Sequence, residues 1–225
     1  MALICCDECS NKISEFAVFC PYCGVPLEKM WELHFNKYAE VENGWLYSYR
    51  GNRETLHIPD YITRILCENE LNVKSIYLNK NIDSININAF ESSLLENIYV
   101  DKGNAHFADV DGILFDKAIN RLIKYPQGKE GLRYNLPETV RICSSRAFSY
   151  NEYLEEIYFP LLFEEIEWAD ILCWGVKTIY LPRDVKNIEK LNDTALNLKF
   201  YKKEITDSTE LNLLKAIFGE DGVFE

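Results

Sequence analysis

The sequence predicts a mainly β protein, in which a small N-terminal metal-binding module precedes a solenoid of short parallel strands. Three observations lead to this fold class. Five of the eight cysteines lie within the first 23 residues. An apolar motif, which ends in proline in four of its copies, recurs about every 22 residues through most of the remaining chain, and a helical pattern of apolar residues closes the chain. We therefore expect the module, then the solenoid with one hairpin insertion, and then a C-terminal capping helix.

Composition narrows the classes of partner. The chain has 225 residues, 48% of them hydrophobic, and a net charge of -12 from 36 acidic and 24 basic side chains. This composition is typical of folded proteins. The negative net charge disfavours nucleic acids and anionic membranes as partners, because binding to either needs a basic protein surface. No stretch approaches the ~18 apolar residues of a membrane span, and the first residues lack a secretory pattern. We expect a cytoplasmic protein whose cysteines bind metal or lie buried as thiols.

The cysteine cluster consists of two C-x-x-C pairs, Cys6 with Cys9 and Cys20 with Cys23, which ten residues separate. Each pair sits on a tight turn that directs two sulfurs toward one point, so two facing turns supply four thiolates. Four thiolates suit a tetrahedral Zn²⁺ ion with bonds of about 2.3 Å. Gly24 follows the second pair, where the turn needs a positive φ. We expect the residues between the pairs to form a small β-hairpin.

Residues 5–25 resemble the short zinc-ribbon found at the start of many bacterial multidomain proteins, and all four cysteines match its ligand pattern. The resemblance implies a structural zinc ion, because four thiolates leave no open position for catalysis. Metal binding would supply the folding free energy of a zinc-ribbon spanning residues 1–26, which is too small to fold alone. A redox dithiol is the alternative, but such a site has a single pair within a βαβ unit. Cys5 could replace Cys6 as the first ligand.

Residues 27–44 are expected to connect the zinc-ribbon to the solenoid and to cover its first coil. Side chains at helical spacing predict a short helix with one apolar face, formed by Leu27, Met30, Trp31, His34 and Phe35. Alternating segments around Asn43-Gly44 predict a hairpin with a type I′ turn, since both central residues of that turn have positive φ. Such a cap is needed because a solenoid otherwise exposes apolar ends.

The repeats occupy residues 45–205. Four units read apolar-x-apolar-Pro with a further apolar residue three positions later, as in Leu56–Ile62 and Ile179–Val185. These units resemble the BspA-type leucine-rich repeat over about residues 45–201. The resemblance implies a leucine-rich-repeat solenoid, whose short parallel strands stack about 4.8 Å apart and end at proline.

The repeat pattern breaks at about residues 101–133, where the segment Asp111–Asp116 is followed by a second apolar segment, Arg121–Pro126. We expect a hairpin insertion there, of the kind that often punctuates this repeat family. Two smaller departures occur: Cys143 replaces an expected isoleucine, and the unit after Pro182 lacks the Ala-Phe pair that two other units carry. These departures concern packing and leave the predicted fold class unchanged.

Residues 206–225 predict a helix that seals the last coil. Ser208 is the expected N-cap and Gly219 the expected residue after the C-cap. The apolar face of this helix is formed by Leu211, Leu214, Ile217 and Phe218.

Strand alternation places one residue of each repeat at the middle of the outer face of the sheet. Four of these seven positions are tyrosine. They are Tyr77, Tyr99, Tyr158 and Tyr180. Stacked in register, they would form a ladder with large contact area and polar tips, which suits a binding face. The alternative is that the rings only stabilise neighbouring strands.

No nucleotide-binding motif or nucleophile elbow occurs, and the three histidines lie in separate segments. We therefore predict no catalytic residue and favour a non-catalytic interaction module or adaptor that binds a protein partner. Two alternatives remain. One is an enzyme or enzyme subunit with a site in the insertion hairpin, near Asp109, Asp111 and Asp116. The other is a glycan-binding or surface-adhesion protein, because the resemblance is to a family whose members are often described as such.

Overall fold

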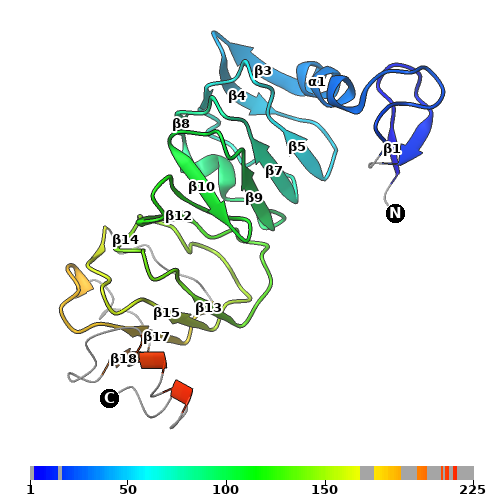
Figure 1. The fold of residues 1–225 in the computed structure, drawn as a ribbon. Helices are drawn as coiled ribbons and strands as arrows, with labels where there is room; N and C mark the ends of the chain where they lie inside the picture. Colours follow the sequence, from blue (N-terminus) through cyan, green and yellow to red (C-terminus); the bar gives the residue numbers. More distant parts are fainter. Residues whose placement is uncertain are drawn as a thin grey trace.

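The structure is a computed structural model that describes residues 3–14, 17–167, 175–188, 197–201, 209, 211–212 and 215–216. The chain forms an elongated solenoid, and a small N-terminal module projects from one end of it (Figure 1). The strands of the solenoid are short and mostly parallel, and the helix α1 (Leu27–Tyr38) joins them to the module. The mainly β fold class predicted from the sequence is confirmed.

The N-terminal module comprises the chain before α1 and contains one antiparallel pair of strands, β1 (Leu3–Cys5) and β2 (Lys12–Ser14). The first cysteine turn is the loop between these strands, and a bridge between Phe19 and Pro26 flanks the second turn in the same way. The prediction of a hairpin between the two cysteine pairs is therefore wrong. Each cysteine turn reverses the chain itself, so the residues on either side of each turn pair with one another.

The helix α1 packs in two directions. Met30 is fully buried against the cysteines of the N-terminal module, whereas Phe35 enters the core of the solenoid. The helix runs directly into the antiparallel hairpin formed by β3 (Ala39–Glu42) and β4 (Trp45–Tyr49). The two turn residues, Asn43-Gly44, have φ angles of 52° and 78°, the type I′ geometry that the sequence predicts.

Two sheets form the first half of the solenoid, and their repeat strands pair in parallel. One contains β5 (Thr55–His57), β7 (Ser75–Leu78) and β9 (Asn97–Val100), and the other extends the β3–β4 hairpin with β6 (Arg64–Ile65) and β8 (Ser84–Ile85). Repeats pair in register, so Ser75 lies opposite Asn97, which is 22 residues later. The short 3₁₀ helix η1 (Ile87–Phe90) carries an Ala-Phe pair into the core.

The second half of the solenoid repeats this order. One sheet contains β13 (Arg133–Asn135), β15 (Glu156–Tyr158), β17 (Thr178–Leu181) and β18 (Asn197–Phe200), and the other contains β12 (Arg121–Lys124), β14 (Ile142–Cys143) and β16 (Glu165–Ile166). In both halves a hairpin strand pairs in parallel with the first short strand, β4 with β6 and β12 with β14. Cys143 takes the inward position of the expected isoleucine and is fully buried.

A strand that was not predicted, β10 (Phe107–Val110), pairs with β11 (Ile113–Asp116) across a turn at Asp111-Gly112. The predicted hairpin insertion is present as β11 and β12, which pair antiparallel. It does not interrupt the solenoid, however. Since β11 pairs with β12, this hairpin begins the sheet of the second half as β3–β4 begins that of the first. The turn at Asp111-Gly112 also holds the preceding repeat, because Gly112 O accepts a backbone hydrogen bond from Ile98 at 2.8 Å.

Inward side chains form one core in each half, and β11 contributes to both. Leu114 belongs to the first core together with Ile98, whereas Ile113 and Phe115 belong to the second core together with Ile157. All five side chains are at most 1% exposed. The hairpin therefore joins the two halves through packing as well as through hydrogen bonds.

The predicted C-terminal helix lies partly within the described residues. Helical residues there are Thr209, Leu211, Asn212, Lys215 and Ala216. Leu211 packs on the last sheet beside Tyr201. The predicted caps and the rest of the apolar face, which are Ser208, Gly219, Leu214, Ile217 and Phe218, lie outside the described residues. Within the part of the chain that the structure describes, no helix has the length and apolar character needed to cross a membrane.

Replacing Gly112 with alanine should destabilise the joining of the two halves. Gly112 has a φ of 74°, and a Cβ atom there would lie 2.5 Å from Asn97 Oδ1. Positive φ alone costs about 1 kcal/mol for an ordinary residue, so we expect the free energy of unfolding to fall by roughly 1–2 kcal/mol. Urea denaturation measures this change. Gly103→Ala, outside the left-handed region, is the control, and an equal loss in both variants would contradict the argument.

Candidate functional site

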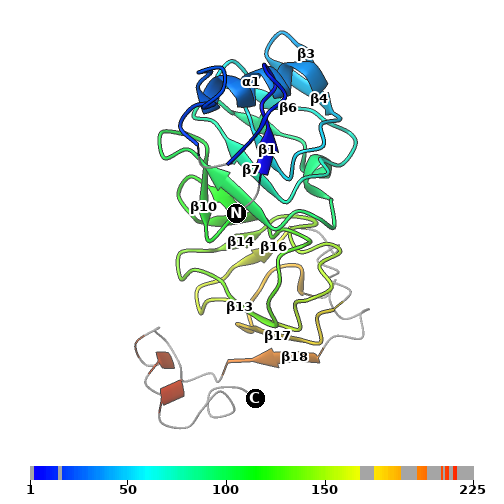
Figure 2. The same ribbon diagram turned by 90° about the vertical axis from the view of Figure 1, so that its right-hand side faces the viewer.

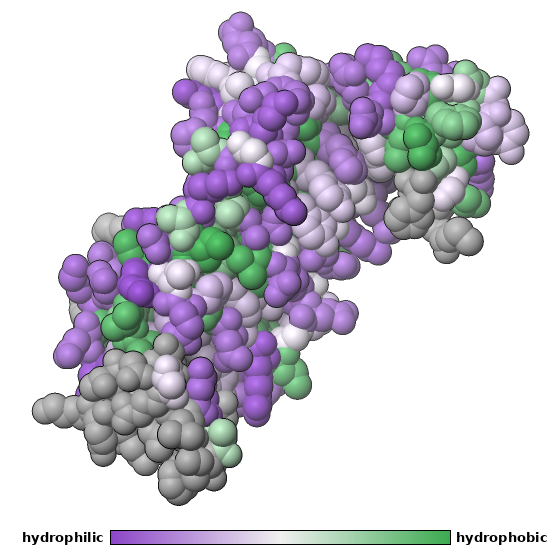
Figure 3. All heavy atoms as spheres, in the orientation of Figure 1, coloured by the Kyte–Doolittle hydropathy of each residue, from purple (hydrophilic) through white to green (hydrophobic). Residues whose placement is uncertain are grey.

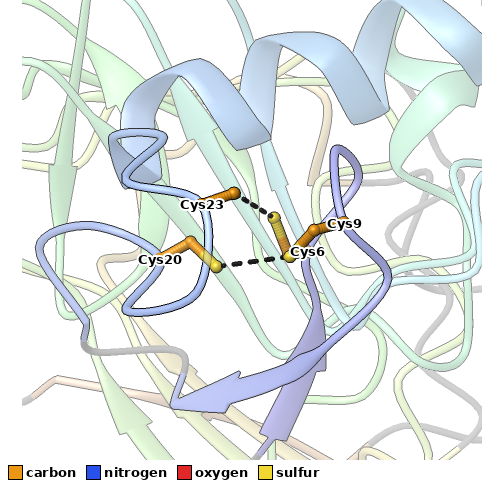
Figure 4. Close-up of side chains that lie close together, drawn as sticks. All are labelled: Cys6, Cys9, Cys20 and Cys23. Carbon is orange, nitrogen blue, oxygen red and sulfur yellow. Dashed lines mark hydrogen bonds between the residues drawn. The ribbon is translucent and has the colours of Figure 1, made fainter.

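The four predicted metal ligands lie together. Cys6 and Cys9 come from the turn after β1, Cys20 and Cys23 come from the turn before α1, and the two pairs face one another (Figure 4). All four Sγ atoms lie within 4.8 Å of one another. The Sγ–Sγ distance is 3.7 Å between Cys6 and Cys23 and 3.6 Å between Cys9 and Cys20. Cys5 lies outside this group, and its side chain is exposed.

The spacing of the sulfurs indicates what the cluster can hold. A disulfide needs sulfurs about 2.05 Å apart. Four sulfurs that bind one ion tetrahedrally at about 2.3 Å lie about 3.8 Å from each other, close to the observed 3.6 and 3.7 Å. The donors are soft and their number fills a tetrahedron. The four cysteines therefore fit a tetrahedral metal ion and leave no open position for a substrate.

The two cysteine turns share one hydrogen-bonding pattern. Ser10 N–H donates to Cys6 O at 2.8 Å in the first turn, and Gly24 N–H donates to Cys20 O at 2.8 Å in the second. Ser10 and Gly24 occupy matching positions and have positive φ angles of 62° and 77°. The sequence predicts this conformation at Gly24, whereas a serine at the equivalent position conceals it in the first turn.

Neighbouring groups shift the pKa values of two thiols in opposite directions. The Asn11 side-chain amide donates to Cys9 Sγ at 3.3 Å and lowers the pKa of Cys9 to about 6. The Val25 backbone acts to lower the pKa of Cys23, but burial and the three neighbouring thiols together raise it to about 12. The group resists losing all of its protons because four thiolates would repel each other. A bound cation makes full ionisation favourable.

An acidic residue of the first cysteine turn holds the N-terminal module against the solenoid. The Asp7 carboxylate accepts hydrogen bonds from His34 Nδ1 at 3.0 Å and from Arg53 Nη2, which also donates to Cys5 O at 3.2 Å. The side chains of Asp7, His34 and Arg53, which we call the joint, are 15%, 7% and 8% exposed. Burial is the main reason that the pKa of His34 is lowered, so His34 is neutral at pH 7.

Four rings form a continuous stack on the outer face of the sheet that contains β5, β7 and β9. We call this stack the aromatic row, and its members in order are Trp31, His57, Tyr77 and Tyr99. Successive ring centroids lie 4.5, 4.4 and 4.8 Å apart. The Arg53 guanidinium lies 4.5 Å over the Trp31 ring, so the row ends at the joint. Two perpendicular views place the N-terminal module in front of this sheet (Figure 1, Figure 2).

The predicted tyrosine ladder is not continuous, and half of it is covered. Tyr158 and Tyr180 stack with their centroids 4.1 Å apart, but they are only 5% and 6% exposed. Tyr201 and Leu211 pack over them. The prediction that all four tyrosines face solvent is therefore wrong for this pair. Strand alternation places both rings on the outer face, but it does not reveal which later segment folds over that face.

In the aromatic row, ring edges rather than ring faces reach the solvent. Tyr77 is 39% exposed, and the other three rings are partly buried. The planes of His57 and Tyr77 differ by only 4°, so each ring covers a face of its neighbour. Burial raises the pKa of Tyr77, which keeps its hydroxyl protonated at pH 7. The row therefore offers apolar edges and hydrogen-bonding tips.

The three aspartates of the enzyme alternative occupy separate structural positions. Asp109 Oδ1 accepts a hydrogen bond from the Val100 N–H at 2.7 Å, which ties β10 to β9. Asp116 Oδ1 accepts from two backbone N–H groups of the following turn, at 2.7 and 2.9 Å. Asp111 forms the hairpin tip with a φ of 51°. Among the described residues, only the four clustered cysteines form a group of three or more potential metal ligands.

Sequence reasoning missed the joint and one end of the aromatic row. Trp31 is recognisable only as part of the face of the connecting helix. No signal marks Arg53, because its partner Asp7 lies 46 residues earlier in the chain. Asp7 itself stands at a position between two cysteines where the C-x-x-C pattern places no requirement on the side chain.

The histidine of the aromatic row should make stability depend on pH. Burial, together with the positive charge of Arg53, lowers the pKa of His57 to about 4. An unfolded histidine titrates near 6.5. Between these values the unfolded chain binds more protons than the folded one, so stability falls as the pH falls. From pH 7 to pH 5 this residue should lower the free energy of unfolding by about 2 kcal/mol.

Urea denaturation at pH 7 and pH 5 measures this loss. The matched variant is His57→Tyr, which introduces the side chain that the next two repeats carry at this position. It should lose less stability than the unmodified protein on going to pH 5, by about the 2 kcal/mol assigned to the histidine. Equal losses in the two proteins would show that His57 is not held neutral by the fold.

Three solved structures resemble this chain at low sequence identity. The pneumococcal vaccine antigen PcpA is 23% identical and aligns over 56% of this chain and 41% of its own length, with a TM-score of 0.44. A leucine rich cell surface protein from Faecalibacterium prausnitzii is 20% identical over 70% of this chain and 56% of its own (TM-score 0.41). A leucine-rich repeat protein from Eubacterium ventriosum is 18% identical over 59% and 55% (TM-score 0.41). The chain thus spans about half the length of these structures.

The sequence of the chain matches a known repeat family. No curated protein matches the chain. A family model of the BspA type leucine rich repeat region matches it in six copies, over residues 32–111 and 132–198. The matched residues make up more than half of the chain, and the gap between them falls on the turn and strands that begin the second half of the solenoid. The chain belongs to the BspA-type leucine-rich-repeat family.

Proposed function

We propose that this protein is a non-catalytic protein-interaction module. In this proposal the aromatic row binds a protein partner, and a zinc ion in the cysteine cluster holds the N-terminal module beside the row. The observation that carries the proposal is the stacked, partly exposed set of rings from Trp31 to Tyr99. Tyrosine and tryptophan suit binding surfaces because they combine large apolar area and hydrogen bonding with a small loss of conformational entropy.

The stacking favours a protein partner over a glycan. A sugar packs its C–H groups on an open aromatic face, where the ring carries its negative quadrupole charge. In the row the faces of His57 and Tyr77 are closed, since these rings lie 4.4 Å apart and almost parallel. The exposed edges and hydroxyls suit the apolar side chains and backbone groups of a peptide segment.

The environment of the hairpin aspartates supports a binding role over an enzymatic one. Asp109 and Asp116 already accept backbone hydrogen bonds that hold β10 and the turn before β12. A general acid or base must instead be free to exchange a proton with a substrate. Repeat solenoids also provide long surfaces that suit partner binding.

Zinc is the metal that we propose for the cysteine cluster. It is redox-inert and binds four thiolates tetrahedrally, which agrees with Sγ–Sγ distances of 3.6 and 3.7 Å. Apart from its cysteines, the described part of the N-terminal module buries one apolar side chain, Ile13. Met30 of α1 belongs to the same cluster. Metal binding therefore supplies much of the free energy that folds the module, and the folded first turn positions Asp7 for the joint.

The purified protein should contain one zinc ion per chain, measured by inductively coupled plasma mass spectrometry. Cys9→Ser or Cys20→Ser should remove the zinc, because each cysteine supplies one thiolate. Cys5→Ser is the control and should keep it. The thermal unfolding of the solenoid, followed by circular dichroism, should change little on zinc loss, because no described residue before α1 belongs to its two cores. Full zinc content in Cys9→Ser, or its loss in Cys5→Ser, would contradict the ligand assignment.

A photo-cross-linking side chain in place of Tyr77 should capture the partner in source cells, because Tyr77 is the most exposed ring of the row. The same side chain at Tyr153 is the control, since Tyr153 is 46% exposed but lies in the other half of the solenoid. The proposal requires a protein that cross-links at position 77 and not at position 153.

The double variant Tyr77→Ser, Tyr99→Ser should then abolish binding of the captured partner while the protein stays folded. The matched control is Tyr47→Ser, Tyr153→Ser, which removes two exposed tyrosines outside the row. Calorimetric titration measures both affinities, and equal affinities would reject the row as the binding surface. Tyr158→Ser should instead lower stability, because Tyr158 is only 5% exposed.

A further inference from the structure

A cleft separates the N-terminal module from the solenoid next to the joint, and we call it the joint cleft. It encloses about 530 Å³, and the space-filling view shows a hollow between the module and the solenoid (Figure 3). Its walls come from the first cysteine turn, from α1 and from the segment leading into β5. The lining side chains include Asp7, Trp31, Lys37, Arg53, Glu54 and Thr55. This volume accommodates a small ligand or the end of a peptide.

The joint cleft opens onto the aromatic row. Trp31 lines the cleft and is also the first ring of the row. Thr55 lines the cleft as well, and it lies on the same face of β5 as His57, because residues two apart on a strand share a face. A ligand that lies along the row can therefore extend into the cleft without leaving the protein surface.

The cleft carries a positive charge that the protein does not neutralise. Asp7 pairs with Arg53, and Glu54 pairs with Lys74 Nζ at 3.2 Å. Lys37 also lines the cleft, where its ammonium lies 5.2 Å from the Tyr38 ring centroid, and no described carboxylate forms an ion pair with it. This positive site differs in sign from the chain as a whole, whose net charge is -12.

Arg53 leaves one hydrogen-bond donor without a partner. Its side chain is 8% exposed, and Nη2 serves both Asp7 and the Cys5 carbonyl, whereas Nη1 has no acceptor. A buried guanidinium donor without an acceptor destabilises the state that contains it. The lining of the cleft thus includes one cation, Lys37, without a described ion-pair partner and one donor, on Arg53, without an acceptor.

We infer that the joint cleft binds a carboxylate at one end of an extended peptide segment whose other residues lie along the aromatic row. This inference rests on the proposed function and adds the chemistry of the partner. The carboxylate pairs with Lys37 and brings acceptor oxygens to the Arg53 side of the cleft. A carboxylate fits better than a phosphate, because the cleft offers one uncompensated positive charge and a phosphate carries nearly two negative ones.

The length of the aromatic row limits the length of the bound segment. Its three centroid steps of 4.5, 4.4 and 4.8 Å give a row of roughly 14 Å. An extended chain rises about 3.3 Å per residue, so about four residues cover the row. The carboxylate that follows them is either the C-terminus of the partner or the side chain of an acidic residue.

The inference also gives the N-terminal module a role in recognition. The first cysteine turn forms one wall of the cleft, and Asp7 holds that wall in place through Arg53 and His34. The carboxylate site is therefore complete only when the module is folded and docked on the solenoid.

Peptides that bind the full-length, zinc-loaded protein can be selected from a library of random decapeptides with free C-termini. Fluorescence anisotropy gives the affinity of each peptide and of two modified forms, one with an amidated C-terminus and one with amides in place of acidic side chains. These two forms distinguish the two sources of carboxylate. The protein variants are Lys37→Gln, the charge-preserving Lys37→Arg, and Lys12→Gln, which removes an exposed lysine outside the cleft.

We expect Lys37→Gln to weaken binding about fivefold or more, and removal of one of the two kinds of carboxylate to do the same. Applied together, the two changes should weaken binding little beyond either one, because they break the same ion pair. Lys37→Arg and Lys12→Gln should bind as the unmodified protein does. Raised salt should weaken peptide binding by the unmodified protein but not by the Lys37→Gln variant.

The outcomes separate this inference from the proposed function. If Tyr77→Ser, Tyr99→Ser abolishes peptide binding but Lys37→Gln and the modified peptides have no effect, the inference is overturned and the proposed function stands. If neither set of changes affects binding, or if the library yields no binding peptide, both are overturned. Loss of affinity in Lys37→Gln with full zinc content and an intact fold supports the carboxylate site.

Discussion

Each coil of this solenoid buries its apolar strand face only by stacking on the next coil, so the fold depends on the strand where two stacks meet. That strand is β11. Leu114 packs into the first core, while Ile113 and Phe115 pack into the second. Alternate side chains of a strand point to opposite faces, which lets one short strand serve both cores. Neither half then ends in an exposed apolar layer at this junction.

Buried asparagines fix how the coils stack. Asn79 and Asn104 each donate to carbonyl groups of the preceding coil, and Asn151 donates to three carbonyl groups in the second half. The sharp turns of a solenoid leave such carbonyls inside the protein, where an amide side chain can satisfy them. The resulting register brings His57 opposite Tyr77 and Tyr77 opposite Tyr99. The aromatic row therefore follows from backbone geometry, and its rings are held at the spacing of the strands.

The N-terminal module reaches the same face through a chain of contacts that starts at the cysteines. The first cysteine turn positions Asp7, which binds Arg53, and Arg53 lies over Trp31 at the end of the row. The first cysteine turn, the joint and the row are thus neighbours in space, although their residues come from separate parts of the chain. In the proposed function, this arrangement lets the N-terminal module contribute to recognition without any chemistry at the cysteine cluster.

Features that depend on local chemistry or on a regular repeat could be predicted from the sequence alone. The C-x-x-C pairs predict the four gathered sulfurs, the 22-residue period predicts the solenoid, and Asn43-Gly44 predicts the first hairpin, because each signal acts over a few residues or repeats regularly. Three other features are evident only in the folded protein: Tyr158 and Tyr180 are covered, the second hairpin begins a new half, and Asp7 contacts Arg53. These features depend on which distant segments pack together, and the free energy of that packing is shared among many side chains, so no short pattern records it.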